Sequence, residues 1–540
     1  MCYTNLALLF DNQIAEVISL DSGEIILREF TEIVTKDDGL VIKTLTKKIT
    51  IEGESARFFA SKVLPLLRSG TTYSRIFRVS EEYKTEDVSG VLEELKRAGV
   101  IREQSGDRKI FQIVEDKFYG DAKIINKVVC NSFKDSEFVF DGKYYAAQYK
   151  PPQDSDGSDE ERLWGLGVAN NEDTALKIAL YEAFERYSNG SYELNDFVFA
   201  SKKQLGERAI NPEEIVKFSD SQHQLPEFPL RRFSNELKTY WIPGNIYPEG
   251  EEILVPIDLV IYPLDTVRSG IERINFANSS GSAARETFKE ALLAAVIELI
   301  ERDAFMIFWL NKLVAPEILQ ESLPQAIRAQ VENIKNRGFD VYIKEISLDL
   351  LPVIFVVAFN RQFSKPAFVC GAGAHFDPEI ALSKAINEIE SSLYYTLNNV
   401  DTISEVSNLH DIFGPEEHGA FYFTYRKEIF DNLEFFKKSS KKLSLSKMPK
   451  TKFNSLSDLA NFLRLKGLKI ISIDITQKDL IGSGVPIRVV KAFMPGLIPI
   501  SFGFSMEPLG MERIYRVPQK LNAQRMVRPG TLNSLPHPFT

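Results

Sequence analysis

Three apolar segments that carry glutamates in register constrain the fold of this 540-residue chain more than any other feature. Residues 175–186 read A-L-K-I-A-L-Y-E-A-F-E-R, residues 291–302 read A-L-L-A-A-V-I-E-L-I-E-R, and residues 381–392 read A-L-S-K-A-I-N-E-I-E-S-S. Alanine, leucine and isoleucine at this spacing predict three buried helices. Glutamates three residues apart share one face of a helix, so the first two helices each present a pair of carboxylates on one side.

The carboxylates point to a shared site. Carboxylates on a buried helix are costly unless a cation pairs with them. A single such helix favours a structural Glu–Arg pair, whereas three in register favour a common site for Mg²⁺ and phosphate oxygens. The candidate metal ligands are Glu182, Glu185, Glu298, Glu301 and Glu388, and the candidate phosphate-binding or bracing residues are Arg186 and Arg302.

Glycines precede each helix, at Gly165 and Gly167, at Gly281, and at Gly371 and Gly373. A residue without a Cβ lets the backbone approach a ligand closely, and a helix start offers free N–H groups. We therefore expect three glycine turns, each opening towards the site.

These motifs resemble those of the YcaO family of ATP-using enzymes. Residues 278–302 resemble the family's Ser-Asn-Gly-x-Ala-x-Gly turn with its Glu-x-x-Glu-Arg helix, and residues 165–186 resemble its Gly-Lys-Gly turn with a second such helix. Residues 381–391 resemble its Ala-Leu-x-Glu-x-x-Gln helix, and residues 474–497 its late strand with a Val-Lys…Pro-Gly-Leu turn. The resemblance covers roughly residues 115–540.

The sequence departs from the family pattern at four positions. Leu166 stands for the lysine of the first motif, Ser280 for an asparagine, Arg285 for a glycine and Ser391 for a glutamine. The carboxylates are all retained, so metal and phosphate binding are better supported than the details of nucleotide contact. Arg285 is a candidate for the positive charge that Leu166 lacks.

The resemblance implies an α+β fold with a YcaO-type ATP-binding domain, with ATP and Mg²⁺ as cofactors. It also implies cyclodehydration of a ribosomal precursor peptide. A Cys, Ser or Thr side chain attacks the preceding amide carbonyl, ATP phosphorylates the resulting oxyanion, and phosphate leaves to give a thiazoline or oxazoline. Ser279, Ser280 and Gly281 would then line the nucleotide turn.

The C-terminal residues L-P-H-P-F-T resemble the Pro-x-Pro-x-Pro end that azoline-forming YcaO enzymes insert towards their active site. Alternating prolines stiffen an extended segment and limit the entropy lost on docking. Pro536 and Pro538 match two of the three prolines, and Thr540 replaces the third. Thr540 is also a candidate base through its carboxylate.

Residues 1–110 form a predicted separate module, followed by the catalytic domain at 115–540. Helices at 54–67, 72–79 and 86–98, with strands at 40–51 and from Val100, fit a winged-helix arrangement. Its third helix carries Glu86, Asp87, Glu93 and Glu94, which would repel DNA phosphates. The module resembles leader-peptide-recognition domains, which bind a peptide as an added strand. A structural or dimerisation module is the alternative.

Composition narrows the class of protein. Hydrophobic content of 44% and charged content of 26% fit a globular chain with a large core, and the net charge of −10 argues against nucleic-acid or anionic-membrane binding. Cys2, Cys130 and Cys370 form no zinc or disulfide pattern, and no apolar run spans a bilayer. The sequence therefore predicts a cytoplasmic enzyme.

Expected partners are the leader and core of a precursor peptide, an activating-type protein or a flavin-dependent azoline oxidase, and a second copy in a homodimer. Three alternative functions remain open: thioamide or amidine formation by the same family, a non-catalytic leader-binding scaffold, and a DNA-binding regulator. The retained carboxylates disfavour the scaffold, and the acidic third helix disfavours the regulator.

Overall fold

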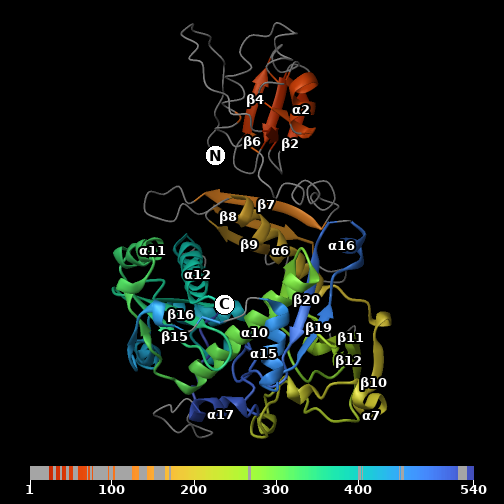
Figure 1. The fold of residues 1–540 in the computed structure, drawn as a ribbon, viewed down its shortest axis with the longest axis vertical. Helices are drawn as coiled ribbons and strands as arrows, with labels where there is room; N and C mark the ends of the chain where they lie inside the picture. The colour runs from red at the N-terminus through yellow and green to blue at the C-terminus, as the bar shows by residue number, and fades with distance from the viewer. Residues whose placement is uncertain are drawn as a thin grey trace. The chain divides into compact units, whose positions relative to one another are not determined.

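The computed structural model describes residues 24–27, 32–36, 39–43, 48–52, 59–69, 71–72, 76, 95, 101–103, 124–132, 143–150, 164–169, 172–264, 269–398, 400, 403, 405–448, 450–451, 455–483, 485–520 and 532–539. The chain divides into two compact units (Figure 1). The first comprises residues 1–133, 142–150 and 156–183, and the second residues 134–141, 151–155 and 184–540.

The first unit contains three small antiparallel sheets. Their strand orders are β5-β1-β6, β2-β3-β4 and β7-β8-β9. The strands are β1 (Glu24–Leu27), β2 (Glu32–Lys36), β3 (Gly39–Lys43), β4 (Lys48–Glu52), β5 (Thr71–Thr72), β6 (Ile101–Glu103), β7 (Ile125–Ser132), β8 (Lys143–Tyr149) and β9 (Trp164–Ala169). A π-helical turn, η1 (Phe59–Val63), continues as α2 (Leu64–Ser69), and α6 (Glu172–Gly190) follows β9 and runs on into the second unit.

The predicted N-terminal module is tested only in part. The expected strand at 40–51 is a hairpin, because Gly39–Lys43 pairs antiparallel with Lys48–Glu52. An alternating pattern does not distinguish one long strand from two strands of a hairpin. The helix at 54–67 is confirmed over Phe59–Leu67, whereas most residues of the other two predicted helices lie outside the described ones. The winged-helix arrangement therefore stays a prediction.

The second unit contains two larger sheets. One has the order β10-β11-β19-β20-β13, with β12 also paired to β11, and the other has the order β17-β16-β15-β14-β18. All neighbours are antiparallel except β14 and β18. The strands are β10 (Val198–Ser201), β11 (Lys238–Tyr247), β12 (Glu251–Pro256), β13 (Ser282–Arg285), β14 (Glu317–Ile318), β15 (Phe339–Glu345), β16 (Val353–Asn360), β17 (Phe368–Ala374), β18 (Lys442–Leu443), β19 (Ile470–Asp474) and β20 (Arg488–Phe493).

Helices cover these sheets on several sides. They are α7 (Lys202–Leu205), α8 (Ile257–Val260), α10 (Phe288–Asn311), α11 (Gln325–Asn336), α12 (Pro378–Asn398), α13 (Pro415–Phe423), α14 (Lys427–Asp431), α15 (Leu456–Leu465), α16 (Lys478–Gly482) and α17 (Arg513–Lys520). Short 3₁₀ turns occur at Leu194–Asp196, Gly206–Arg208, Pro212–Glu214, Gln222–Gln224, Gln320–Ser322, Leu409–Asp411, Glu434–Phe436 and Leu445–Lys447.

Helix α10 lies between the two large sheets (Figure 1) and packs against β13 and β20 of one and against β16 and β17 of the other. Thr287 begins the helix with a capping box, in which its hydroxyl accepts the Glu290 N–H and the Glu290 carboxylate accepts the Thr287 N–H. Every residue from Asp303 to Asn311 is buried. The sequence prediction of a core helix is therefore confirmed.

Strand β16, which lies between β17 and β15, is buried along its whole length. Phe355 and Val357 face the core around α10, whereas Ile354 and Val356 face a second core that includes α11 and α12. Alternate residues of a strand point to opposite faces, so this sheet separates two apolar layers. The continuous apolar run Val353–Phe359 reflects burial on both faces.

Most of the predicted glycine turns are strands instead. Gly165 and Gly167 lie within β9, and Gly371 and Gly373 lie within β17. A Cβ on Gly167 would stand 1.9 Å from the Ala175 carbonyl oxygen, and one on Gly373 would stand 2.1 Å from that of Ala381. These glycines therefore let a strand pack directly against the backbone of the helix that follows it.

Gly281 does form the expected turn. Its φ of +72° lies in the left-handed region, and the Ser282 N–H donates to the Ser279 carbonyl oxygen over 2.9 Å. The sequence could not separate these two uses of glycine, because both require the absence of a Cβ.

We expect Gly373→Ala to lower the free energy of unfolding by about 1–3 kcal/mol, because the added methyl group must displace helix α12. Chemical denaturation of the purified protein measures this change. Gly482→Ala is the matched control, since a Cβ there has no neighbour within 4 Å and alanine favours a helix. Equal effects of the two substitutions would contradict the close strand–helix contact.

Candidate active site

The glutamates at the shared position of the three repeats make the same hydrogen bond. Within the first unit, the Glu182 Oε2 atom accepts the Leu166 N–H over 2.8 Å. Within the second, Glu298 Oε2 accepts the Gly281 N–H over 3.0 Å, and Glu388 Oε2 accepts the Ala372 N–H over 2.7 Å. Each carboxylate is thus oriented by the strand or turn that precedes its own helix.

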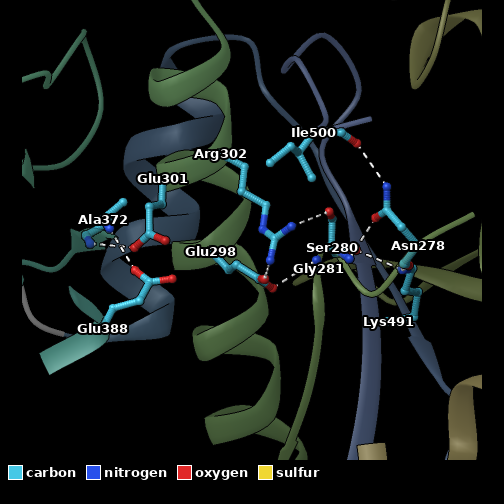
Figure 2. A network of polar contacts seen from close by, with 11 residues as sticks. Asn278, Ser280, Gly281, Glu298, Glu301, Arg302, Ala372, Glu388, Lys491 and Ile500 are labelled. Atoms are coloured by element: carbon cyan, nitrogen blue, oxygen red, sulfur yellow. Dashed lines mark hydrogen bonds and ion pairs between the residues drawn. The ribbon is translucent and has the colours of Figure 1, made fainter. Parts of the chain in front are cut away.

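Helix α10 contributes a second carboxylate and a guanidinium (Figure 2). Glu301 Oε2 accepts the Ala374 N–H of β17 over 2.7 Å. Arg302 lies 2.6 Å from Glu298 Oε1 and donates to the Ser280 hydroxyl over 3.0 Å. The guanidinium is therefore fixed between the acidic helix and the Ser280–Gly281 turn.

Glu301 and Glu388 turn their carboxylates towards each other (Figure 2). Desolvation, together with the neighbouring Glu301 charge, raises the pKa of Glu388 from the usual 4.5 to about 8. Desolvation also raises the pKa of Glu301, which the Lys384 charge opposes. Part of the Glu388 residue is exposed to solvent, but its carboxylate is densely surrounded by protein. Desolvation is therefore the largest cause of its raised pKa. Burial therefore favours the protonated form of both carboxyl groups.

Two lysines of the site were missed by the sequence analysis. Lys491 of β20 is buried and donates to the carbonyl oxygens of Asn278 (2.5 Å) and Ser280 (2.8 Å). Burial lowers its pKa to about 8, which the charges of Glu298 and Glu185 oppose. Glu185, a predicted metal ligand on α6, thus lies within electrostatic reach of Lys491.

Lys384 lies one turn before Glu388 on α12, and desolvation lowers its pKa while the Glu301 charge raises it. The Arg285 charge lowers that pKa too, so Arg285 lies within electrostatic reach of Lys384, and its role in place of the expected lysine stays a prediction. The four-residue spacing of Lys384 and Glu388 was the available sequence signal for this lysine.

Asn278, which was not among the predicted nucleotide ligands, holds the turn that contains Ser279 and Ser280. Asn278 orders the turn, because its Oδ1 atom accepts the Ser280 N–H over 2.8 Å and its amide donates to the Ile500 carbonyl over 2.9 Å (Figure 2). Ser279 provides the carbonyl that closes the turn. Arg186 follows Glu185 on α6.

The described part of the C-terminal segment, residues 532–539, is inserted into the core. Pro536 and Pro538 are buried, and the ring of Phe539 packs edge-on against that of Phe305 on α10 at 4.4 Å. Phe305 lies one turn beyond Glu301, so the segment reaches the helix that bears the acidic site. Thr540 lies outside the described residues.

The donor set fits a magnesium–phosphate ligand. Among the described residues, no three acidic, histidine or cysteine side chains converge closely enough to form a metal centre as they stand. Carboxylate oxygens are nevertheless the ligands that Mg²⁺ takes, and the Oε1 atoms of Glu301 and Glu388 have no hydrogen-bond partner in that part of the chain. The Arg302 guanidinium suits phosphate oxygens.

We expect Glu388→Gln to gain stability relative to the wild type as the pH rises from about 4.5 to about 8 without added metal. The folded-state pKa of Glu388 is raised, so its favourable contribution is complete below the unfolded value and is lost as the pH approaches 8. Thermal unfolding across this range measures the difference. Ser391→Ala, an uncharged change on the same helix, is the control, and a pH-independent difference for Glu388→Gln would contradict the raised pKa.

Comparison with known proteins agrees with this geometry. A family model described as YcaO cyclodehydratase, ATP- and Mg²⁺-binding, matches residues 166–498. An uncharacterized protein of Methanothermobacter thermautotrophicus is 27% identical over 223 residues, which cover 40% of this chain and 54% of that protein. The chain thus spans about half the length of that curated relative.

Solved structures share the fold. A heterocyclase in complex with substrate and cofactor matches with a TM-score of 0.63 and 23% identity, covering 77% of this chain and 55% of that one. The heterocyclase TruD matches with a TM-score of 0.53 and 15% identity, covering 96% of this chain and all (100%) of that one. The mixed helix-and-sheet fold is therefore that of the heterocyclases.

In the described part of the chain, no helix has the length and apolar character needed to cross a membrane.

Proposed function

We propose that this protein is an ATP-dependent cyclodehydratase of a ribosomal precursor peptide. The chain belongs to the YcaO family of ATP- and Mg²⁺-binding proteins, which is the starting point of this proposal. Its products would be thiazolines from Cys and oxazolines from Ser or Thr. The observation that carries the proposal is that Glu388 of α12 faces Glu301 of α10, with Glu298 and Arg302 paired beside them (Figure 2). These side chains form one charged site beside the Ser280–Gly281 turn.

The reaction requires a backbone amide oxygen to leave, and ATP with Mg²⁺ supplies the phosphoryl group and charge neutralisation that make this feasible. Glu298, Glu301 and Glu388 would hold the metal, with Glu185 beside Lys491 as a further ligand. Arg302 is already aligned by Glu298 and Ser280, so it can contact phosphate oxygens without reorganisation. The metal role of Glu182 and the phosphate role of Arg186 stay predictions.

The protein's contribution would be mainly positioning. The attacking hydroxyl or thiol is a weak nucleophile, so the peptide must be held close to the activated amide. The buried Pro536–Pro538 segment would shape one wall of the peptide site, and the Thr540 carboxylate stays a candidate base. Leader recognition by residues 1–110, a homodimer, and an activating protein or azoline oxidase as partner are also predictions.

The defining experiment incubates the protein with ATP, Mg²⁺ and small peptides encoded nearby, followed by mass spectrometry. Loss of about 18 Da per event, the mass of water, indicates cyclodehydration or amidine ring closure. A gain of about 16 Da, from the replacement of the amide oxygen by sulfur, indicates thioamidation. Absence of any ATP-dependent mass change would leave a binding scaffold as the better description.

We expect Glu298→Gln to abolish ATP-dependent loss of water while leaving the thermal unfolding midpoint nearly unchanged. Glutamine can still accept the Gly281 N–H, but it removes the negative charge that holds metal and aligns Arg302. Glu290→Gln, an exposed change on the same helix that preserves the N-terminal cap, is the matched control. Normal turnover by Glu298→Gln would remove that carboxylate from the mechanism.

A further inference from the structure

The carbonyl groups of four consecutive C-terminal residues are each held by a side chain from elsewhere in the chain. Pro536 and Pro538 have no N–H, so this segment cannot be held by a full strand ladder, and its carbonyls carry the attachment. Trp309 Nε1 donates to the Leu535 carbonyl oxygen over 3.2 Å, and the Tyr422 hydroxyl donates to that of Pro536. His418 Nδ1 donates to the His537 carbonyl oxygen over 2.7 Å, and Cys370 Sγ donates to that of Pro538 over 3.6 Å.

Geometry alone fixes the proton on His418. The Gly503 N–H donates to His418 Nε2 over 2.9 Å, so that nitrogen carries no hydrogen. The proton of the neutral ring is therefore on Nδ1, from which it is donated to the His537 carbonyl. Burial lowers the pKa of His418 to about 4, in agreement with a neutral ring.

His537 is held from both ends. Its carbonyl accepts from His418, and its Nε2–H donates to the Ser501 carbonyl oxygen over 2.7 Å. Its ring is fully buried, and its centroid lies 4.3 Å from that of His418. Neither neighbouring proline offers a side-chain or backbone donor to Ser501, so a shift of the segment by one residue would lose this bond. His537 therefore defines a single register.

The register matters because Phe539 packs against Phe305 of α10, the helix that bears the acidic site. The Pro538 carbonyl meets Cys370 of β17, two residues before Ala372, whose N–H orients Glu388. The charge of Arg302 lowers the pKa of His537, which places the imidazole within electrostatic reach of the site. A displaced segment would move Phe539 and whatever follows it relative to these side chains.

We infer that His418 is a positioning residue, which sets the register of the C-terminal segment against the acidic site by donating from Nδ1 to His537 while accepting from Gly503. Its expected effect on turnover rests on the proposed function. Its effect on the attachment of the segment does not, so the two can fail separately.

Two near-isosteric substitutions divide the roles of the two ring nitrogens. His418→Asn places an amide nitrogen where Nδ1 lies and keeps the donor to His537, whereas His418→Gln places an amide oxygen where Nε2 lies and keeps the acceptor for Gly503. If His418 sets the register, asparagine preserves function better than glutamine. If His418 only supports the Gly503 loop, the order is reversed.

The experiment measures turnover with ATP and peptide, the KM for ATP, and the rate at which carboxypeptidase Y removes the last two residues, followed by intact mass. We expect His418→Gln to lower kcat by about tenfold or more at unchanged KM for ATP, since small misplacements are costly to positioned reactions. It should also accelerate trimming, whereas His418→Asn should stay close to the wild type in both. Equal behaviour of the two variants, or better function of glutamine, overturns the inference.

Two further variants guard against misfolding. Tyr422→Phe removes only the hydroxyl that donates to the Pro536 carbonyl. It should accelerate trimming of the C-terminal residues without a large change in the thermal unfolding midpoint. An unchanged trimming rate counts against attachment of the segment through its carbonyls. His223→Asn alters another histidine packed among aromatic rings, those of Phe218 and Phe228, and should change neither measurement. If the wild type modifies no peptide, the proposed function fails, and the order of trimming rates still decides the role of His418.

Discussion

The second unit depends on one helix being both the centre of the core and the support of the charged site. Helix α10 is packed between two sheets, which requires an apolar surface, yet Glu298, Glu301, Arg302 and Asp303 follow within six residues. The cost of burying these charges is offset locally. Asp303 is 1% exposed and is held by Arg513 and by the Ile498 N–H, while the two glutamates accept backbone N–H groups. Rigid packing around the helix in turn fixes the carboxylates.

The same solution recurs along the chain. Leu166, Gly281 and Ala372 each give a backbone N–H to the glutamate 16 or 17 residues later. In β9 and β17 the neighbouring glycines allow the helix to approach closely enough for that bond. Only a substitution by proline removes a backbone N–H, so the orientation of the acidic side chains tolerates most variation at the donor positions. Leu166 itself, in place of an expected lysine, illustrates this tolerance.

Periodicity in the sequence predicted the acidic helices and the core position of α10, because both are local properties. The role of the glycines was predicted incorrectly at four of five positions, because a tight turn and a close strand–helix contact require the same residue. Lys491 appeared in a recognised motif, but no local pattern shows that it binds carbonyls more than 200 residues earlier. The donors to the C-terminal segment are similarly distant, with Tyr422 and His418 more than 100 residues from their acceptors.

The facing carboxylates of Glu301 and Glu388 have a consequence for ligand loading. With a pKa of about 8, Glu388 retains its proton at neutral pH in much of the population. On the proposed assignment of these carboxylates to Mg²⁺, binding of the cation would displace that proton, so loading would be linked to acid release. The heat of binding would then vary with the ionisation enthalpy of the buffer, and apparent metal affinity would strengthen in mildly alkaline solution.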